Sequence, residues 1–264
     1  MKAKLIQIHW HETKPIYSID FEAGPKSRLA TAGGDTNVRI WQLIAEAGKP
    51  PQVEFLSNLS RHSAAVNVVR FSPTEEILAS AGDDGSVILW KPTEDKLSGG
   101  NAFLDNEDSA FEKEKWKVSS ILRGSLSDIY DLAWSPDGKK IITGSIDNTA
   151  RIWDVKEGKC LHVFADHDHY VQGVAWDPLG QYVVTQSSDR SVHIHSYRTK
   201  GNGQLVTTSV NKNMKLREAK VPEDIPDLTP NTKLQKSSYI YHSEMIKTFF
   251  RRLSFTPDGT LLLT

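Results

Sequence analysis

The sequence predicts an all-β protein of the β-propeller class, because one pattern of polar and aromatic residues recurs along it. In each copy a Ser or Thr stands ten residues before an aromatic ring, and an Asp stands six residues before that ring. The copies are Thr31–Asp35–Trp41, Ser80–Asp84–Trp90, Thr143–Asp147–Trp153 and Thr185–Asp189–His195. Self-similarity at a period of about 40–60 residues indicates a repeat architecture in which each copy is one blade of roughly four strands.

Two further observations support this fold class. Another aromatic residue stands nine or ten residues before each Ser or Thr, namely Phe21, Phe71, Trp134 and Trp176. A fifth copy begins at Phe255-Thr-Pro-Asp-Gly259, and the sequence ends at Thr264 before the Asp and Trp of that copy. We therefore expect four full blades plus the start of a fifth, a truncated ring with about seven blades when complete.

The blade cores are expected at residues 14–44, 62–91, 124–156, 167–198 and 242–264. In the second core, Ala65–Phe71 alternates and is rich in β-branched residues, which favours a strand, and Ser72-Pro73 ends it. Ile77–Ser80 is the next strand, and a turn at Asp83-Asp84-Gly85 leads into Val87–Trp90. The other cores follow the same course, and Leu5–Ile8 also has the composition of a strand.

Two insertions separate these cores. Residues 92–116 are acidic and rich in Gly and Ser, and are predicted to form a mobile loop between the second and third blades. Residues 199–236 are polar and contain three prolines, so we expect the outer strand of blade four followed by a loose connection.

Composition limits the classes of partner. The 264 residues carry a net charge of −1, with 32 basic and 33 acidic side chains, so we expect no sequence-specific DNA binding by a global positive field. The single cysteine, Cys160, excludes an internal disulfide and suits a reducing compartment. No segment approaches 18 apolar residues, and we predict no membrane interaction.

The recurring polar residues have a structural interpretation. Within a blade, the Asp can accept a hydrogen bond from a His that bonds the Ser or Thr, whose oxygen receives the Trp indole N–H. His62 and His167 stand 18 residues before Ser80 and Thr185, and both suit this role. The third copy has Ser125 at that position, and the first has Thr13 with His11 close by. A Ser–His–Asp hydrolase would need an exposed nucleophile, and recurrence in every blade favours a scaffold.

Metal and cofactor sites are not predicted. Histidines two residues apart occur at His9/His11, His167/His169 and His193/His195, but zinc usually needs three or four ligands and Cys160 is the only thiol. His195 occupies the position of the repeat's Trp, which favours packing in the core. No glycine-rich phosphate loop enters a helix, because Ala32–Asp35 is a hairpin turn.

A segment in the fifth copy is a candidate partner surface. Phe249, Phe250, Arg251 and Arg252 fall where the innermost strand of the fifth blade begins. They are either a strand with one buried Phe and solvated charges, or an aromatic–Arg anchor of the kind found at interaction hot spots. Strand alternation would bury one Phe and expose the other.

Three longer stretches resemble a known family. His9-Trp-His11 with Lys14–Asp20, Tyr170–Gly180, and Phe249–Gly259 are similar to the middle, WD-repeat subunits of chromatin assembly factor 1. The resemblance spans essentially the whole sequence. The related histone-regulator propellers are also similar around Lys14–Ser18, but fit the other two stretches less well.

The resemblance implies a non-enzymatic subunit of a nuclear histone chaperone that deposits histones H3–H4 on replicated or repaired DNA. It implies the large and small subunits of chromatin assembly factor 1 as partners, with histones reached through the complex. It also implies a second histone chaperone, docked through a C-terminal tail that this sequence lacks. The alternatives are a replication-independent histone-regulator subunit, a generic WD-repeat adaptor, or a hydrolase built on a propeller.

Overall fold

A computed structural model describes residues 11–45, 51–93, 112–124, 127–200, 205–211, 216–218, 237–239, 241 and 250–264. All its regular elements are β-strands, and most belong to four antiparallel sheets of four strands each. This confirms the all-β propeller class, whereas about seven blades for a complete ring remains a prediction. No helix in the described part of the chain is long and apolar enough to cross a membrane.

Each four-stranded sheet follows the chain order, as expected of a blade built from successive hairpins. The first has β1 (Ile16–Phe21), β2 (Arg28–Gly33), β3 (Asn37–Ile44) and β4 (Gln52–Ser60). The second has β5 (Val66–Phe71), β6 (Leu78–Gly82), β7 (Ser86–Thr93) and β8 (Lys115–Arg123). The third has β9 (Ile129–Trp134), β10 (Lys140–Ser145), β11 (Ala150–Asp154) and β12 (Cys160–Phe164). The fourth has β13 (Val171–Trp176), β14 (Tyr182–Ser187), β15 (Val192–Thr199) and β16 (Leu205–Asn211).

Two smaller sheets complete the described strands. β17 (Leu216–Glu218) pairs with β18 (Ser237–Tyr239), and β19 (Ser254–Phe255) pairs with β20 (Leu262–Leu263). The β19–β20 hairpin lies at the expected start of the fifth blade. The strand predicted at Leu5–Ile8 lies outside the described residues.

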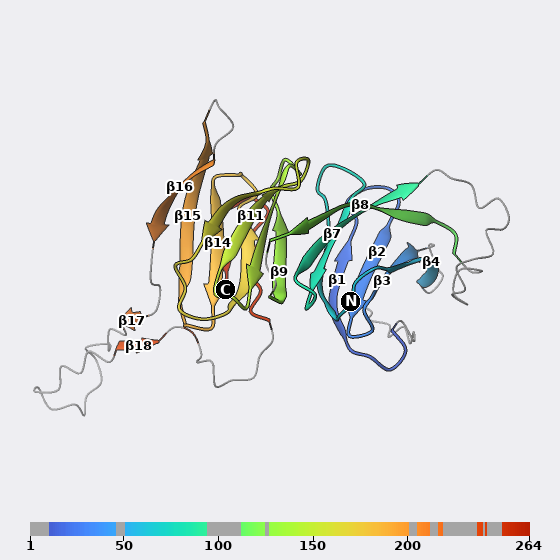
Figure 1. Cartoon of the computed structure of the whole chain (residues 1–264), viewed down its shortest axis with the longest axis horizontal. Coiled ribbons are helices and arrows are strands. Elements are labelled where there is room, and N and C mark those ends of the chain that lie inside the picture. Colours follow the sequence, from blue (N-terminus) through green and yellow to red (C-terminus); the bar gives the residue numbers. More distant parts are fainter. Residues whose placement is uncertain are drawn as a thin grey trace, which may run out of the picture.

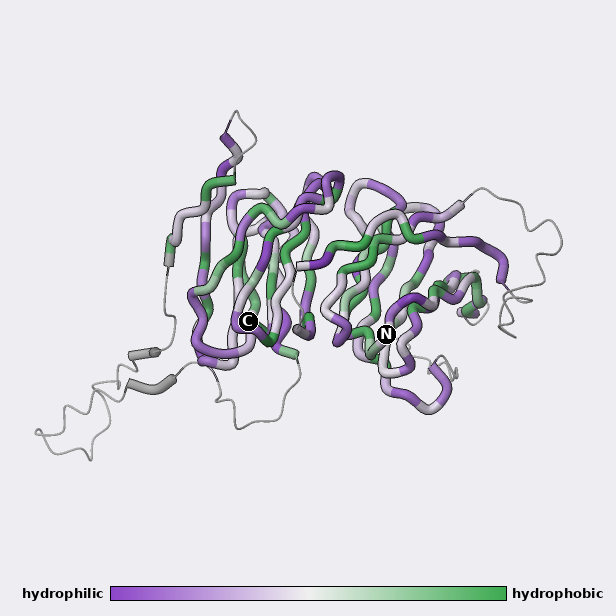
Figure 2. The backbone as a smooth tube through the Cα atoms, viewed as in Figure 1, coloured by the Kyte–Doolittle hydropathy of each residue, from purple (hydrophilic) through white to green (hydrophobic). Residues whose placement is uncertain are grey.

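Successive sheets contact each other through their first strands. β1 lies beside β5, β5 beside β9, β9 beside β13, and β13 beside β19 (Figure 1). Each apolar core cluster accordingly contains residues of two neighbouring blades. Ile40 of the first blade, for example, shares a cluster with Leu78 of the second. Figure 2 shows hydrophobic stretches within the sheets and hydrophilic ones at many of the turns between them.

One turn geometry recurs directly after each Asp of the repeat. The next residue adopts a left-handed backbone conformation in all four blades, at Thr36, Gly85, Asn148 and Arg190, with φ between 67° and 68°. Only Gly85 takes this conformation without steric strain, and a β-branched residue such as Thr36 rarely does so. The surrounding hydrogen bonds therefore impose the same turn on different residue types.

The first insertion lies within the second blade, since β7 pairs with β8, and the prediction that it separates blades two and three was wrong. Both insertions contain more regular structure than a continuous loop. β8 begins at Lys115, and the residues just before it contact the first blade: the N–H groups of Lys113 and Glu114 donate to the carbonyl of Leu56. β16 lies in the second insertion and is the outer strand of blade four. Residues 94–111 and 219–236 lie outside the described part.

Candidate functional site

The polar network of the second blade joins four side chains, which we call a tetrad. His62 Nδ1 lies 2.8 Å from Asp84 Oδ2, and His62 Nε2 lies 2.7 Å from Ser80 Oγ. The indole Nε1–H of Trp90 donates to the same Ser80 oxygen at 2.8 Å. Ser80 is fully buried, so a substrate carbonyl has no access to its hydroxyl. The tetrad stabilises the turn and does not present a nucleophile.

The electrostatics of Asp84 follow from this network. Burial alone would raise its pKa, but the hydrogen bond and charge of His62 and two hydrogen bonds from Ser86 outweigh burial. The pKa of Asp84 is therefore well below its ordinary value. Asp189 in the fourth blade has a similarly lowered pKa, because bonds from His167, Ser191 and the Asp168 N–H outweigh its burial.

The first blade forms its tetrad with His11. His11 Nε2 lies 2.8 Å from Thr31 Oγ1, its Nδ1 lies 2.6 Å from Asp35 Oδ1, and Trp41 donates to Thr31 at 2.9 Å. The 18-residue spacing pointed to Thr13, and the structure places His11 there instead. A turn in which the Lys14 N–H donates to the His11 carbonyl brings the ring into position.

The third and fourth blades depart from the full tetrad. In the third, Trp153 donates to Thr143 at 2.9 Å and Asp147 pairs with Arg151 at 2.7 Å, while Ser125 lies outside the described residues. In the fourth, His167 lies 2.8 Å from Thr185 and 3.1 Å from Asp189. His195 takes the Trp position and packs on Phe164, with ring centroids 4.4 Å apart.

A second set of bonds joins neighbouring blades, and sequence reasoning missed it. Carboxylates on the first strands accept backbone N–H groups of the next blade: Asp20 from Phe71 at 2.7 Å and Asp131 from Val174 at 3.0 Å. Ser18 Oγ accepts similarly from the Val69 N–H at 3.1 Å. Burial raises the pKa of Asp131 despite the nearby charges of Arg70 and Arg252. These bonds between blades do have a signal in the sequence. It is an acidic or hydroxyl side chain that stands one or three residues before the first aromatic residue of the blade.

The described part of the candidate partner segment contacts several blades at once. Arg252 donates to the backbone carbonyls of Tyr17 at 3.1 Å and Asn67 at 2.8 Å. Its Nε lies 3.5 Å from Asp131 Oδ1, so its guanidinium connects the segment before β19 to three other blades. Burial lowers the pKa of Arg252, although Asp131 opposes this.

The neighbours of Arg252 are held in the same region. The Arg252 guanidinium lies over the Phe250 ring at 4.6 Å, and Phe250 packs between Tyr17 and Tyr130 at 5.8 and 6.1 Å. Arg251 donates its backbone N–H to the carbonyl of Gln172. Phe249 lies outside the described residues, so the expected contrast between the two Phe side chains stays a prediction.

These sheets and tetrads define the chain as a WD-repeat β-propeller. A family model described as the CAF1B/HIR1 beta-propeller domain matches residues 1–264, and the chain belongs to this family.

The chain is 46% identical to the B subunit of chromatin assembly factor 1 from Mus musculus, over 100% of this chain and 44% of that protein. It is 40% identical to the Saccharomyces cerevisiae protein of the same name, over 100% of this chain and 58% of that protein. Protein HIRA of Zea mays is 36% identical over 58% of this chain and 16% of its own length. The chain therefore spans about half the length of these chromatin assembly factor relatives.

Proposed function

We propose that this chain is the propeller of a WD-repeat protein in a histone chaperone complex that deposits H3–H4 on DNA during replication and repair. The observation that carries the proposal is the match, along the whole chain, to relatives named as a chromatin assembly factor 1 component, at 46% identity in one case. The fold supports it, because the recurring Ser/Thr and His side chains are buried and, with half-buried Asp side chains, hold the turns of the blades as a scaffold. Such a scaffold acts by docking other chains.

The proposed partners are the large and small subunits of chromatin assembly factor 1, with histones H3–H4 reached through the complex in the nucleus. Docking of a second histone chaperone would need a C-terminal tail outside this sequence. The relatives are named as one subunit of a larger factor, which supports a multi-subunit assembly. We assign no catalytic role to the chain within it.

A replication-independent histone-regulator subunit is the second candidate. It is favoured by the family description, which includes HIR1, and by the similarity to Protein HIRA. The identity argues for the first candidate, since the chain is 46% identical to a chromatin assembly factor relative over its whole length and 31% identical to Protein hir-1 of Neurospora crassa over 88% of it.

Affinity purification of the tagged full-length protein, followed by mass spectrometry, tests the proposal. We expect the large chromatin assembly factor subunit and H3–H4 to co-purify in stoichiometric amounts. Recovery of histone-regulator subunits in their place would favour the second candidate. Recovery of a ubiquitin-ligase or RNA-processing complex without histones would overturn both.

The partner surface is proposed to include Phe249, Phe250 and Arg251. The contacts of Arg252 with Tyr17, Asn67 and Asp131 favour a role within the fold for that side chain. Arg251→Ala should reduce the affinity for the large chaperone subunit a few-fold to a hundredfold, the range for hot-spot Arg residues. Pull-down at matched protein levels measures this. Unchanged capture with a folded Arg251→Ala variant would place the interface elsewhere.

A further inference from the structure

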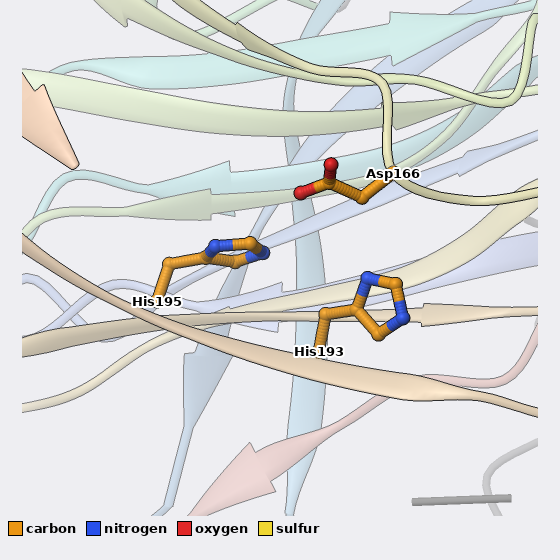
Figure 3. Close-up of side chains that lie close together, drawn as sticks. All are labelled: Asp166, His193 and His195. Carbon is orange, nitrogen blue, oxygen red and sulfur yellow. The ribbon is translucent and has the colours of Figure 1, made fainter. Parts of the chain in front are cut away.

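Three potential metal ligands meet on the fourth blade, apart from the bonds that join His167 to Thr185 and Asp189. His193 and His195 are two residues apart on β15 and therefore lie on the same face of that strand. Asp166 comes from the connection between β12 and β13, and Figure 3 shows its carboxyl group lying near both imidazole rings. One ligand atom from each residue lies within 4.8 Å of the other two.

The surroundings hold both rings in place. His193 is 3% exposed and stacks on His167, with centroids 4.1 Å apart and planes 12° from parallel. His167 is itself fixed by its bonds to Thr185 and Asp189. His195 is 2% exposed and packs on Phe164. Two imidazoles held by packing lose little freedom when they bind an ion, so the site is largely preorganised.

Asp166 differs from the histidines, because it is exposed on a connecting segment. Its exposed carboxylate is the one ligand of the cluster that solvent reaches, so we place the coordinated water on the Asp166 side. The sequence suggests only pairs of histidines as metal ligands. The third donor comes from a different element 27 residues before His193 (193 − 166 = 27), a spacing that matches no common zinc motif.

We propose that Asp166, His193 and His195 bind one Zn²⁺ ion, with water completing the coordination. Two nitrogen donors and one carboxylate suit a first-row transition-metal ion better than Mg²⁺ or Ca²⁺, which take oxygen ligands. Tetrahedral zinc with bonds of about 2.0–2.2 Å places its ligand atoms about 3.4 Å apart. The donors lie within 4.8 Å of each other, so binding requires only a modest approach, led by the exposed Asp166. The ion would fasten the β12–β13 connection to β15.

Zinc titration of the chelator-treated full-length protein tests the site. The ion is added as zinc chloride at neutral pH and followed by calorimetry, and Co²⁺ absorption reports the coordination number. We expect one saturable site that the His193→Gln/His195→Gln double variant lacks. Asp166→Asn should weaken binding by at least about tenfold, the lower end of what even outer-shell losses cost.

Two control variants separate this cluster from other donors. Cys160→Ser removes the exposed thiol, and His169→Asn removes a histidine that packs on Tyr170. Both should bind zinc as the wild type does. If the double histidine variant fails to fold, Asp166→Asn decides, because the exposed Asp166 can be changed without loss of structure. Wild-type affinity in a folded Asp166→Asn variant, absence of saturable binding, or loss of binding in Cys160→Ser would each overturn the proposal.

Discussion

In the first two blades the tetrad hydroxyl accepts a hydrogen bond from one indole while bonding one imidazole, so its bonding capacity is largely used. Ser80 in the second blade and Thr31 in the first have no contact with solvent. A buried polar group that loses its partner is destabilising by more than the bond itself contributes, because water cannot replace the partner. The tetrads therefore act as strict local constraints on the turn that follows each Asp.

Asp84→Ala should lower the free energy of unfolding by about 1–3 kcal/mol, the usual cost of unsatisfied buried polar groups. The substitution removes the acceptor of His62, of the Ser63 N–H and of Ser86. Urea denaturation followed by tryptophan fluorescence measures the change. Glu157→Ala, which removes only an exposed pair with Lys159, serves as the control and should leave the midpoint unchanged. Equal midpoints for both variants would contradict the role given to Asp84.

The lowered pKa values of Asp84 and Asp189 predict acid sensitivity. The folded state binds these protons less tightly than the unfolded chain does, whose Asp pKa is about 3.9. The stability that each carboxylate contributes is therefore fully present above about pH 5 and is lost as the pH falls through the unfolded value towards the folded one. We expect Asp84→Asn to have a shallower loss of stability between about pH 5 and pH 3 than the wild type. Urea midpoints measured across that range test this, and parallel curves would be inconsistent with it.

At the scale of elements, the first strands of the blades carry the contacts that order the sheets around one another. A Cβ atom on Gly173 in β13 would lie 1.8 Å from the carbonyl oxygen of Arg251. Glycine is thus required there because the backbone of the next blade approaches too closely for any side chain. No pattern within the fourth repeat distinguishes this glycine, since the backbone that approaches it lies almost eighty residues later.

Gly173→Ala should destabilise the packing of β13 against the 250–255 segment. Overpacking against backbone typically costs about 1–3 kcal/mol. Gly34→Ala is the matched control, because a Cβ there would meet only the Pro15 side chain at 3.3 Å and the Tyr17 hydroxyl beyond it. Hydrogen exchange of the β13 amides should increase in Gly173→Ala and stay unchanged in Gly34→Ala. Unaltered exchange in both would contradict the close approach.

Arg252→Ala should lower stability more than Arg251→Ala. The first change leaves the carbonyls of Tyr17 and Asn67 without this donor and removes a charge near the buried Asp131. We expect it to lower the free energy of unfolding by about 1–3 kcal/mol. Arg251 bonds the Gln172 carbonyl through its backbone N–H, which the substitution retains. Thermal denaturation of both variants at matched concentration measures the difference. Equal midpoints would indicate that the Arg252 side chain contributes no more to stability than Arg251 does, as expected for the solvated charge that the sequence also allowed.

At the scale of the whole molecule, the cores lie between blades, so each blade depends on its neighbour. Each apolar cluster contains residues of two successive blades. For example, Val68 of the second blade and Leu132 of the third belong to the same cluster. Interactions between the chain and a partner are expected at surfaces that this arrangement leaves open. The net charge of −1 gives no overall attraction to nucleic acid.

The isolated chain should therefore bind duplex DNA only weakly and without sequence preference. Affinity for DNA depends on the number of phosphates that basic side chains neutralise, and a balanced charge neutralises few. Fluorescence anisotropy with two unrelated duplexes at low and physiological salt measures the affinity and its salt slope. Tight binding that depends strongly on duplex sequence would contradict the docking role proposed here.

The sequence by itself determined the repeat, the blade class and most tetrad members. These features depend on short spacings: in all four blades the Asp six residues before an aromatic ring accompanies the same hairpin register. The tetrad bonds of Ser80 and Thr185 lie where that spacing puts them. The family could also be inferred from the sequence, because the resemblance depends on continuous stretches of residues.

Only the tertiary structure decided which distant groups meet. It selected His11 over Thr13, because a turn of the backbone and not residue count positions the ring. It joined Arg252 to blades more than a hundred residues away and brought Asp166 beside His193 and His195. A spacing records local geometry, whereas these contacts depend on how one blade packs against the next. That packing is set by side-chain volume and backbone approach between successive blades, which no local pattern encodes.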